Sequence, residues 1–230
     1  MHICYIIKII IKKKIILFIM KEFFLETPSG KINILEGIDI LNIKAIILHL
    51  HGLSCHFQHI YRSCDDLDYK DEFFSKYNYK SIGFEYRGHG KSDGRQHTIY
   101  DFNDLITDLE NVIKLINFKY PNKKIFLVGE SMSGAVVLKY IALRTHNISG
   151  IVLLSPMCGI EKSIRPSYIM QSIMFFVSKI LPHINYTLST SIADSSILNK
   201  KYIIAYANHP FTKLTGIHYV HCANCMIIVY

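Results

Sequence analysis

Short apolar runs recur at regular intervals through the middle of this chain. Each has the length and the continuous hydrophobicity of a strand that is buried on both faces of a parallel sheet. These runs are residues 44–52, 81–86, 124–129 and 150–156. Helix-like segments separate them, and an alternation of strands and helices is typical of an α/β domain. The pattern therefore predicts a mostly parallel sheet with helices on both faces.

The clearest of these helices spans residues 99–119. Its apolar side chains recur at helical spacing, its acidic residues come early and its lysines late. We expect the helix to end before Pro121, because proline cannot continue a helix. Residues 61–79 are polar around the pair Phe73 and Phe74, and they are predicted as a second helix.

The start of the chain departs from this alternation. Residues 1–20 are rich in isoleucine, but lysines at position 8 and at 12–14 leave no stretch near the ~20 apolar residues of a membrane span. We interpret them as a basic, apolar leader that lies on a membrane surface or, alternatively, as a frayed extension. Residues 23–35 hold a Pro-Ser-Gly turn between two apolar runs, which predicts a hairpin.

Beyond residue 156 the alternation stops. Residues 167–181 predict a helix that is apolar nearly all round and ends before Pro182. Such a helix needs cover. In a helical cap above the sheet, its methionine and phenylalanine side chains would line an acyl pocket or touch a membrane; alternatively, they pack within the cap.

Composition narrows the function classes. Half of the 230 residues are apolar, so the chain is able to bury the core of one sizeable domain. The formal charge of +8 comes from scattered lysines, which argues against a nucleic-acid partner and favours anionic membrane surfaces or acidic substrates. The six cysteines lack the density of a secreted disulfide scaffold. We therefore predict mostly reduced thiols in a cytoplasmic or peripherally membrane-associated protein.

The apolar run at 124–129 ends on Gly129-Glu-Ser131 and continues at once into a helix-forming segment. A strand that turns into a helix on Gly-x-Ser exposes the serine hydroxyl beside the free N–H groups of the helix start, which suits a nucleophile. The backbone N–H of Met132 and that of Leu53, in the loop after the 44–52 strand, are candidates for an oxyanion hole. The usual motif is G-x-S-x-G, but here Ser133 takes the fifth position and the glycine follows as Gly134.

Three motifs at predicted strand ends carry a family resemblance: Leu48-His-Leu-His-Gly-Leu53, Glu85-Tyr-Arg-Gly-His-Gly-Lys-Ser-Asp-Gly94 and Gly129-Glu-Ser-Met-Ser-Gly-Ala135. In this order and spacing they resemble the monoacylglycerol lipase and lysophospholipase branch of the α/β-hydrolase superfamily, over residues 23–216. The resemblance implies that Ser131 is the nucleophile and that Leu53 and Met132 supply the oxyanion hole. It also implies that residues 87–90 form a structural turn beside the site, and that a lipid ester is hydrolysed without a cofactor.

The rest of a catalytic triad is harder to place. In this family an aspartate and then a histidine follow the cap, each after a further core strand. The candidates here are Asp194 and His218 or His221, and Asp194 does not follow an apolar strand. We therefore predict an α/β-hydrolase core that is truncated at its C-terminal end. Its function is that of a serine esterase for lysophospholipids or monoacylglycerols or, alternatively, that of an inactive, lipid-associated relative.

These predictions divide the chain into a leader (residues 1–20), the N-terminal part of the core (21–157), a cap (158–214) and the start of a C-terminal core segment (215–230). The last segment holds two histidines and two cysteines within residues 218–225, a composition that invites zinc binding. Structural zinc sites normally draw their ligand pairs from separated segments, so we favour a tail without chemistry of its own and predict no metal.

Overall fold

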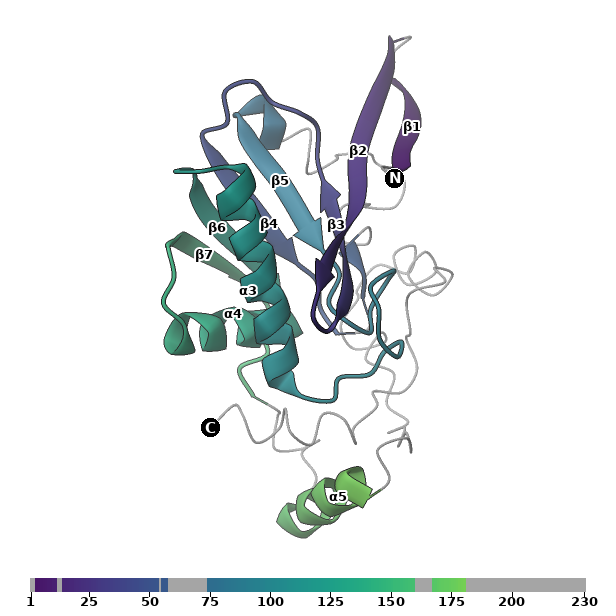
Figure 1. The fold of residues 1–230 in the computed structure, drawn as a ribbon, viewed down its shortest axis with the longest axis vertical. Coiled ribbons are helices and arrows are strands. Elements are labelled where there is room, and N and C mark those ends of the chain that lie inside the picture. Colours follow the sequence, from purple (N-terminus) through teal and green to yellow (C-terminus); the bar gives the residue numbers. More distant parts are fainter. Residues whose placement is uncertain (1–2, 12–13, 54, 58–73, 160–166, 181–230) are drawn as a thin grey trace.

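The computed structural model describes residues 3–11, 14–53, 55–57, 74–159 and 167–180. These residues form a seven-stranded sheet in the order β1-β2-β3-β5-β4-β6-β7, and the two helices within residues 102–143 pack against it (Figure 1). The strands are β1 (Ile3–Ile11), β2 (Lys14–Thr27), β3 (Gly30–Glu36), β4 (Ala45–Leu50), β5 (Tyr79–Phe84), β6 (Lys124–Glu130) and β7 (Ile148–Leu154). The helices are α3 (Phe102–Lys119), α4 (Met132–Leu143) and α5 (Tyr168–Ile180).

The sheet has a parallel and an antiparallel part. Strands β5, β4, β6 and β7 run parallel, as the apolar runs predicted. The predicted burial of the run at 150–156 is wrong, because β7 is the last strand of the described sheet and its residues are exposed or half-buried. Strand β4 lies between β5 and β6, and all six of its residues are buried. Strand β3 joins this part through an antiparallel pairing with β5. The carboxyl ends of β4 and β6 therefore lie side by side, which brings their following loops together.

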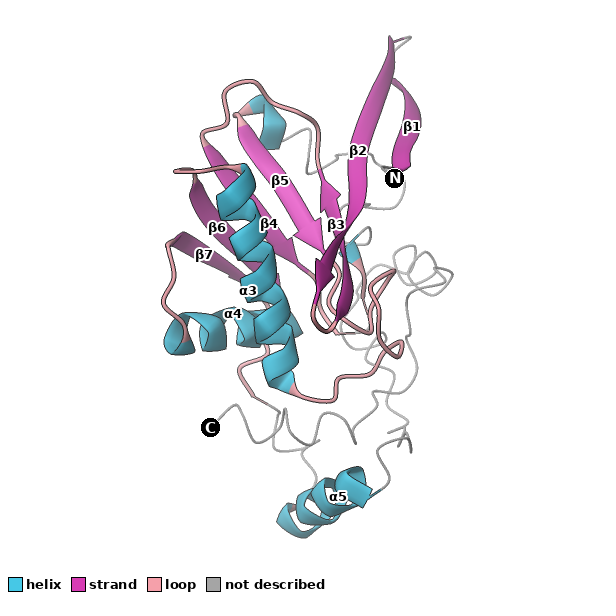
Figure 2. Cartoon of the chain, in the orientation of Figure 1, coloured by secondary structure: helices cyan, strands magenta, loops and turns pink. Residues whose placement is uncertain are grey.

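The N-terminal residues form the antiparallel part of the sheet. The hairpin predicted over residues 23–35 is confirmed as β2 and β3, with Thr27 paired to Gly30. Strand β2 runs without a break through residue 20, where the predicted leader ends. Residues 3–11 also form a strand, which pairs along β2 (Figure 2). A membrane role for this segment stays a prediction.

Helix α3 begins at Phe102 because Asp101 caps it, accepting a hydrogen bond from the N–H of Asn103 (2.8 Å). It ends at Lys119, before Pro121, close to the predicted bounds. The apolar positions that predicted the helix are all buried in the core: Phe102, Leu105, Ile106, Leu109, Val112, Ile113 and Ile116. Helix α4 packs against α3, β6 and β7, so the two helices share one face of the sheet (Figure 1).

The helix predicted over residues 61–79 lies largely outside the described residues. Residues 74–76 are helical, but Tyr77 and Asn78 form a turn and Tyr79 already belongs to β5. The predicted end is therefore wrong, because Asn78 adopts a positive φ of 64° that stops the helix. Helices on both faces of the sheet stay a prediction.

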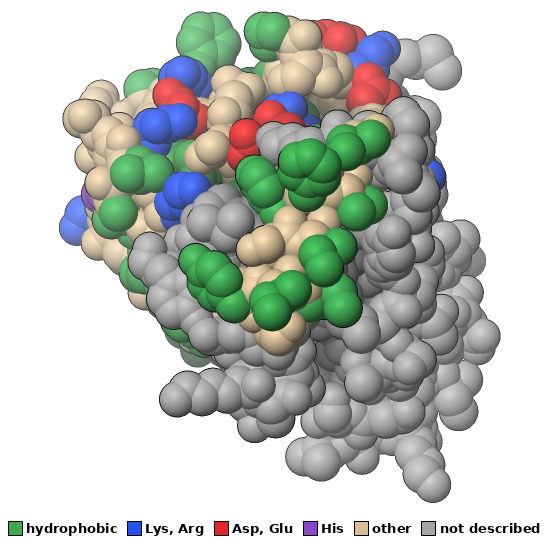
Figure 3. All heavy atoms as spheres, turned by 90° about the horizontal axis from the view of Figure 1, so that it is seen from below, with side chains coloured by type: hydrophobic (Ala, Val, Ile, Leu, Met, Phe, Trp, Pro, Cys, Tyr) green, Lys and Arg blue, Asp and Glu red, His purple; other side chains and the backbone are tan. Residues whose placement is uncertain are grey.

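Helix α5 matches the helix predicted over residues 167–181. Its apolar side chains are strongly exposed, with Tyr168 at 85% and Ile169 at 74%, and hydrophobic side chains gather on this side of the molecule (Figure 3). Most of the predicted cap, residues 158–214, and all of 215–230 lie outside the described part of the chain. Within the described residues, the helices are too short or too polar to cross a membrane.

Candidate active site

Ser131 lies between β6 and α4 in a strained backbone conformation, with φ 52° and ψ −115°. L-residues other than glycine rarely adopt such values, because Cβ crowds the backbone. The residue is exposed, and its hydroxyl makes no capping bond to α4. The hydroxyl is therefore accessible at the end of the strand and does not serve as a cap for the helix.

Neighbouring backbone groups hold Ser131 in this conformation. Its N–H donates to the carbonyl of Leu154 at the end of β7 (3.0 Å), and its carbonyl accepts from the N–H groups of Gly134 and Met157 (both 2.9 Å). These bonds tie the turn to β7 and to the chain that follows it. Strained residues persist where the surrounding structure over-determines them, as it does here.

The two predicted oxyanion donors flank this serine in the fold. Met132 is the first residue of α4, a position whose N–H has no acceptor within its own helix. On the other side, the loop after β4 approaches so closely that a Cβ on Gly52 would lie 3.3 Å from Cβ of Ser131. Leu53 follows Gly52 and is half-buried. The roles of Leu53 and Met132 stay predictions, but their elements meet at Ser131.

Ser133 joins the loops after β4 and β5, a role that the sequence did not predict. It is fully buried, and its hydroxyl is hydrogen-bonded to the backbone carbonyl of His51 and to the hydroxyl of Tyr86 (3.1 Å). The available signal was its place in the motif, where a serine replaces the usual glycine. The helix still passes close to β7, because Gly134 provides the space: a Cβ there would lie 2.4 Å from Cβ of Pro156.

His51 precedes Gly52, which approaches Ser131 in the fold, but its ring is not placed to act as a base. Its Nε2 accepts from the N–H of Tyr86 (3.2 Å), so its Nδ1 carries the proton and donates to the carbonyl of Gly52 (2.8 Å). The ring is completely buried, and burial holds its pKa well below 6.5. Both nitrogens thus serve the loop structure.

The loop after β5, predicted as a structural turn, is fixed by ionic contacts. Asp108 of α3 is buried and binds the Arg87 guanidinium through both oxygens, while one of its oxygens also accepts the Arg87 backbone N–H (3.0 Å). Gly90 rests on the Glu85 carboxylate, which accepts from the N–H of Lys91 (2.7 Å). Burial raises the pKa of Glu85. These contacts fix the loop, which reaches the candidate site through the bond between Tyr86 and Ser133.

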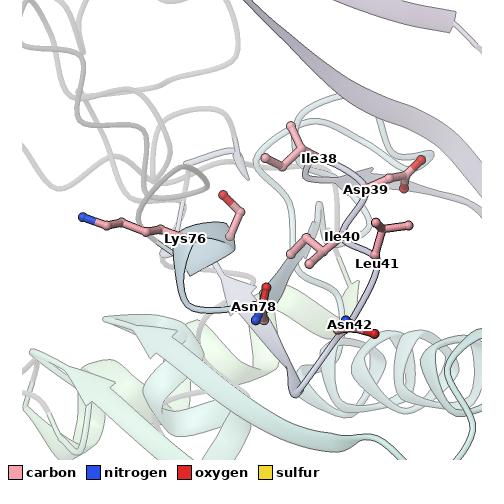
Figure 4. Close-up of a pocket in the computed structure, with 8 residues that line it drawn as sticks. Ile38, Asp39, Ile40, Leu41, Asn42, Lys76 and Asn78 are labelled. Carbon is pink, nitrogen blue, oxygen red and sulfur yellow. The ribbon is translucent and has the colours of Figure 1, made fainter.

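A groove of about 600 Å³ lies elsewhere, between residues 38–42 and the turn before β5 (Figure 4). These segments precede β4 and β5, whereas Ser131 follows the carboxyl end of β6. In a parallel sheet these are opposite edges, so the groove is separate from the candidate site. Lys80 lies near it but is buried, and its ammonium donates to the carbonyls of Gly37 (2.7 Å) and Ile38 (3.0 Å).

The predicted triad partners are not part of this geometry. Asp194, His218 and His221 all lie outside the described residues, as does the cysteine- and histidine-rich tail. In the described part of the chain, no three histidine, cysteine or acidic side chains come together as metal ligands would.

The amino-acid sequence is similar to those of monoglyceride lipases from two mammals. Monoglyceride lipase of Rattus norvegicus is 26% identical over 176 residues, which cover 76% of this chain and 54% of that protein. The Mus musculus enzyme is 29% identical over 178 residues, with the same shares. The chain thus spans about half the length of these curated relatives.

Solved structures give the same answer for the architecture. A soluble variant of monoglyceride lipase from Saccharomyces cerevisiae superposes with a TM-score of 0.65 at 20% identity, covering 89% of this chain and 67% of that one. Paleococcus ferrophilus monoacylglycerol lipase superposes with a TM-score of 0.63 at 19% identity, covering 86% and 70%. Finally, residues 42–226 match the family model described as serine aminopeptidase, S33. This match spans most of the sequence, so the chain belongs to that family of α/β-hydrolases.

Proposed function

We propose that this chain is a carboxylic ester hydrolase that acts on monoacylglycerols or lysophospholipids, with Ser131 as the nucleophile. The observation that supports this most strongly is the exposed, uncapped hydroxyl of Ser131 at a strained strand-to-helix turn. The preference for lipid esters rests on the relatives, several of which are monoglyceride lipases.

In this mechanism Oγ of Ser131 attacks the ester carbonyl carbon and gives up its proton. The negative oxygen of the tetrahedral intermediate is held by the backbone N–H groups of Leu53 and Met132, aided by the positive end of the α4 dipole. The C–O bond to the glycerol part then breaks, and the alcohol leaves with the proton. Water hydrolyses the acyl-serine, releasing the fatty acid and restoring the hydroxyl.

The base that takes the serine proton is a separate part of the proposal. His51 is excluded because both of its ring nitrogens are engaged. His218 or His221, with Asp194 as the acid, remain the sequence candidates. Without an activating base, only the oxyanion hole and binding would contribute to the rate.

Labelling with a fluorophosphonate probe tests the proposal, because such probes report an activated serine. We expect labelling of the wild-type chain that Ser131→Ala abolishes. Ser155→Ala is a matched control, since Ser155 is also exposed, has a positive φ of 45° and directly follows the neighbouring strand β7. Labelling that survives Ser131→Ala would refute the assignment of the nucleophile.

The same samples distinguish an esterase from an inactive relative. Hydrolysis of a monoacylglycerol and of a lysophospholipid, each compared with Ser131→Ala, would identify the preferred headgroup. A folded wild-type chain that binds lipid vesicles but neither labels nor hydrolyses either ester would instead support the lipid-associated, non-catalytic alternative.

A further inference from the structure

The hydroxyl of Ser133 sits at a junction between the three motif segments of the fold. It contacts the carbonyl of His51, in the segment after β4, and the hydroxyl of Tyr86, in the segment after β5. Ser133 itself belongs to the first turn of α4. All three residues are completely buried, so the contacts are shielded from water.

The proton positions in this junction follow from the acceptors. A serine hydroxyl has one proton, and a backbone carbonyl can only accept, so Ser133 donates to the carbonyl of His51. The Tyr86 hydroxyl must then donate to Oγ of Ser133. The N–H of Tyr86 in turn donates to Nε2 of His51 (3.2 Å), which closes a ring of hydrogen bonds through the three residues.

This ring of hydrogen bonds connects the two segments whose separation sets the geometry of the proposed oxyanion hole. His51 lies two residues before Leu53, whereas Ser133 lies one residue after Met132, so the bond links the segments that carry the two donors. The close approach of Gly52 to Ser131 shows that the segments meet at the nucleophile. A glycine at position 133, as in the usual motif, would provide no such link.

We propose that Ser133 is a positioning residue: its hydroxyl fixes the loop after β4 against the start of α4 and so sets the spacing of the Leu53 and Met132 N–H groups. This inference rests on the proposed function for its catalytic consequence. The mechanical link itself does not depend on catalysis, because the bonds exist in the free chain.

Two substitutions and a control test the link in the full-length chain. Ser133→Ala removes the hydroxyl, and Tyr86→Phe removes its donor while leaving the bond from Ser133 to His51. Ser81→Ala is the matched control, because Ser81 is an equally buried serine whose hydroxyl makes no hydrogen bond within the described residues.

The first measurement is hydrogen exchange of backbone amides, which needs no activity. We expect Ser133→Ala to speed exchange in the segment 51–57 while α3 and β6 keep wild-type protection, and Tyr86→Phe to have a smaller effect. A merely structural role would speed exchange in the whole core. Wild-type exchange of the segment 51–57 in Ser133→Ala, or faster exchange spread evenly over the core, would overturn the proposal.

The second measurement is the rate of fluorophosphonate labelling. Loss of an oxyanion donor costs about 10²–10³ in rate, so a displaced donor should cost less, about tenfold. Ser81→Ala should label at the wild-type rate. If the wild type does not label, the proposed function fails while hydrogen exchange still decides the link. If the segment loosens but labelling stays at the wild-type rate, the positioning role is refuted.

Discussion

The backbone strain at Ser131 is a property that two substitutions can measure. Ser131→Ala removes the hydroxyl and keeps Cβ, whereas Ser131→Gly removes both. Because the hydroxyl makes no capping bond, its loss alone should change stability little. The difference between the two variants therefore isolates the cost of placing a Cβ at φ 52° and ψ −115°.

The expected magnitude follows from two opposing effects. A non-glycine residue in such a conformation costs about 1–3 kcal/mol, which Ser131→Gly would relieve. Glycine also gives the unfolded chain more freedom, which costs about 0.4–1 kcal/mol. We expect Ser131→Gly to be more stable than Ser131→Ala by about 1 kcal/mol, or a higher Tm by about 2–4 °C for a chain of this size.

Urea unfolding followed by circular dichroism provides the assay, with thermal unfolding as a second measure. The same pair of substitutions at Ser172, an exposed residue within α5, is the control. There the order should reverse, because glycine is less favourable than alanine in a helix by about 1 kcal/mol. If Ser131→Gly is no more stable than Ser131→Ala, the turn stores no strain and the reasoning is wrong.

Three further substitutions are tested by urea unfolding. Gly134→Ala should cost about 1–3 kcal/mol, because its methyl would lie 2.4 Å from Cβ of Pro156. Asp108→Ala should cost about 3 kcal/mol, because it leaves the half-buried Arg87 without its bidentate partner. Burial lowers the pKa of His89 to about 4, so His89→Asn should flatten the pH dependence of the free energy of unfolding below pH 6.5. Between pH 6.5 and 4 the imidazole of His89 binds a proton in the unfolded state but not in the folded state. The wild type should therefore lose up to about 3 kcal/mol of its free energy of unfolding as the pH falls from 6.5 to 4.

Each of these predictions has a control. Gly159→Ala adds a methyl with no atom within 4 Å and should be neutral. Glu110→Gln removes partly exposed ion pairs with Lys114 and Arg144 and should cost less than about 1 kcal/mol. His89→Asn and the wild type should have equal pH slopes above pH 7.5, where the ring is neutral in both states. Equal pH slopes of His89→Asn and the wild type between pH 6.5 and 4 would contradict the effect of burial on His89. Losses of stability in Gly134→Ala and Asp108→Ala that are no larger than those of their controls would contradict the predictions for these two variants.

The core of the fold was predictable because its signals are local and redundant. The apolar run at 44–52 became β4 with a shift of at most two residues, since a strand covered on both faces must be apolar throughout. The end of α3 was predictable for a similar reason, because its apolar face and the following Pro121 agree, whereas its start lies three residues later than predicted, at the Asp101 cap. The sequence does not predict β1, because lysines interrupt an isoleucine-rich stretch that is equally typical of a basic, apolar leader. In the structure the same lysines are part of a hairpin, in which Ile11 pairs with Lys14.

The candidate site was predictable in part. The strand-to-helix turn at Ser131 follows from the local pattern after Gly129, and the structure has it between β6 and α4. The role of Ser131 as the nucleophile stays a prediction. The contact between Ser133 and His51 joins residues 82 positions apart, and no local pattern encodes it. The same holds for Arg87 and Asp108, whose pairing depends on how α3 lies against the loop after β5. Contacts between residues this far apart in the sequence can be identified only from the three-dimensional structure.

The departure from the usual motif illustrates how one residue's roles can be divided between two. A glycine at the fifth position allows a helix to pass close to a neighbouring strand, but in this chain that approach occurs at Gly134, against Pro156. Position 133 instead faces the loop after β4, where a hydroxyl finds the buried carbonyl of His51. Because the space is provided one residue later, the serine adds a polar link at no steric cost. The variation is therefore compatible with the strand-to-helix turn, and it couples the helix after Ser131 to the loop that carries Leu53.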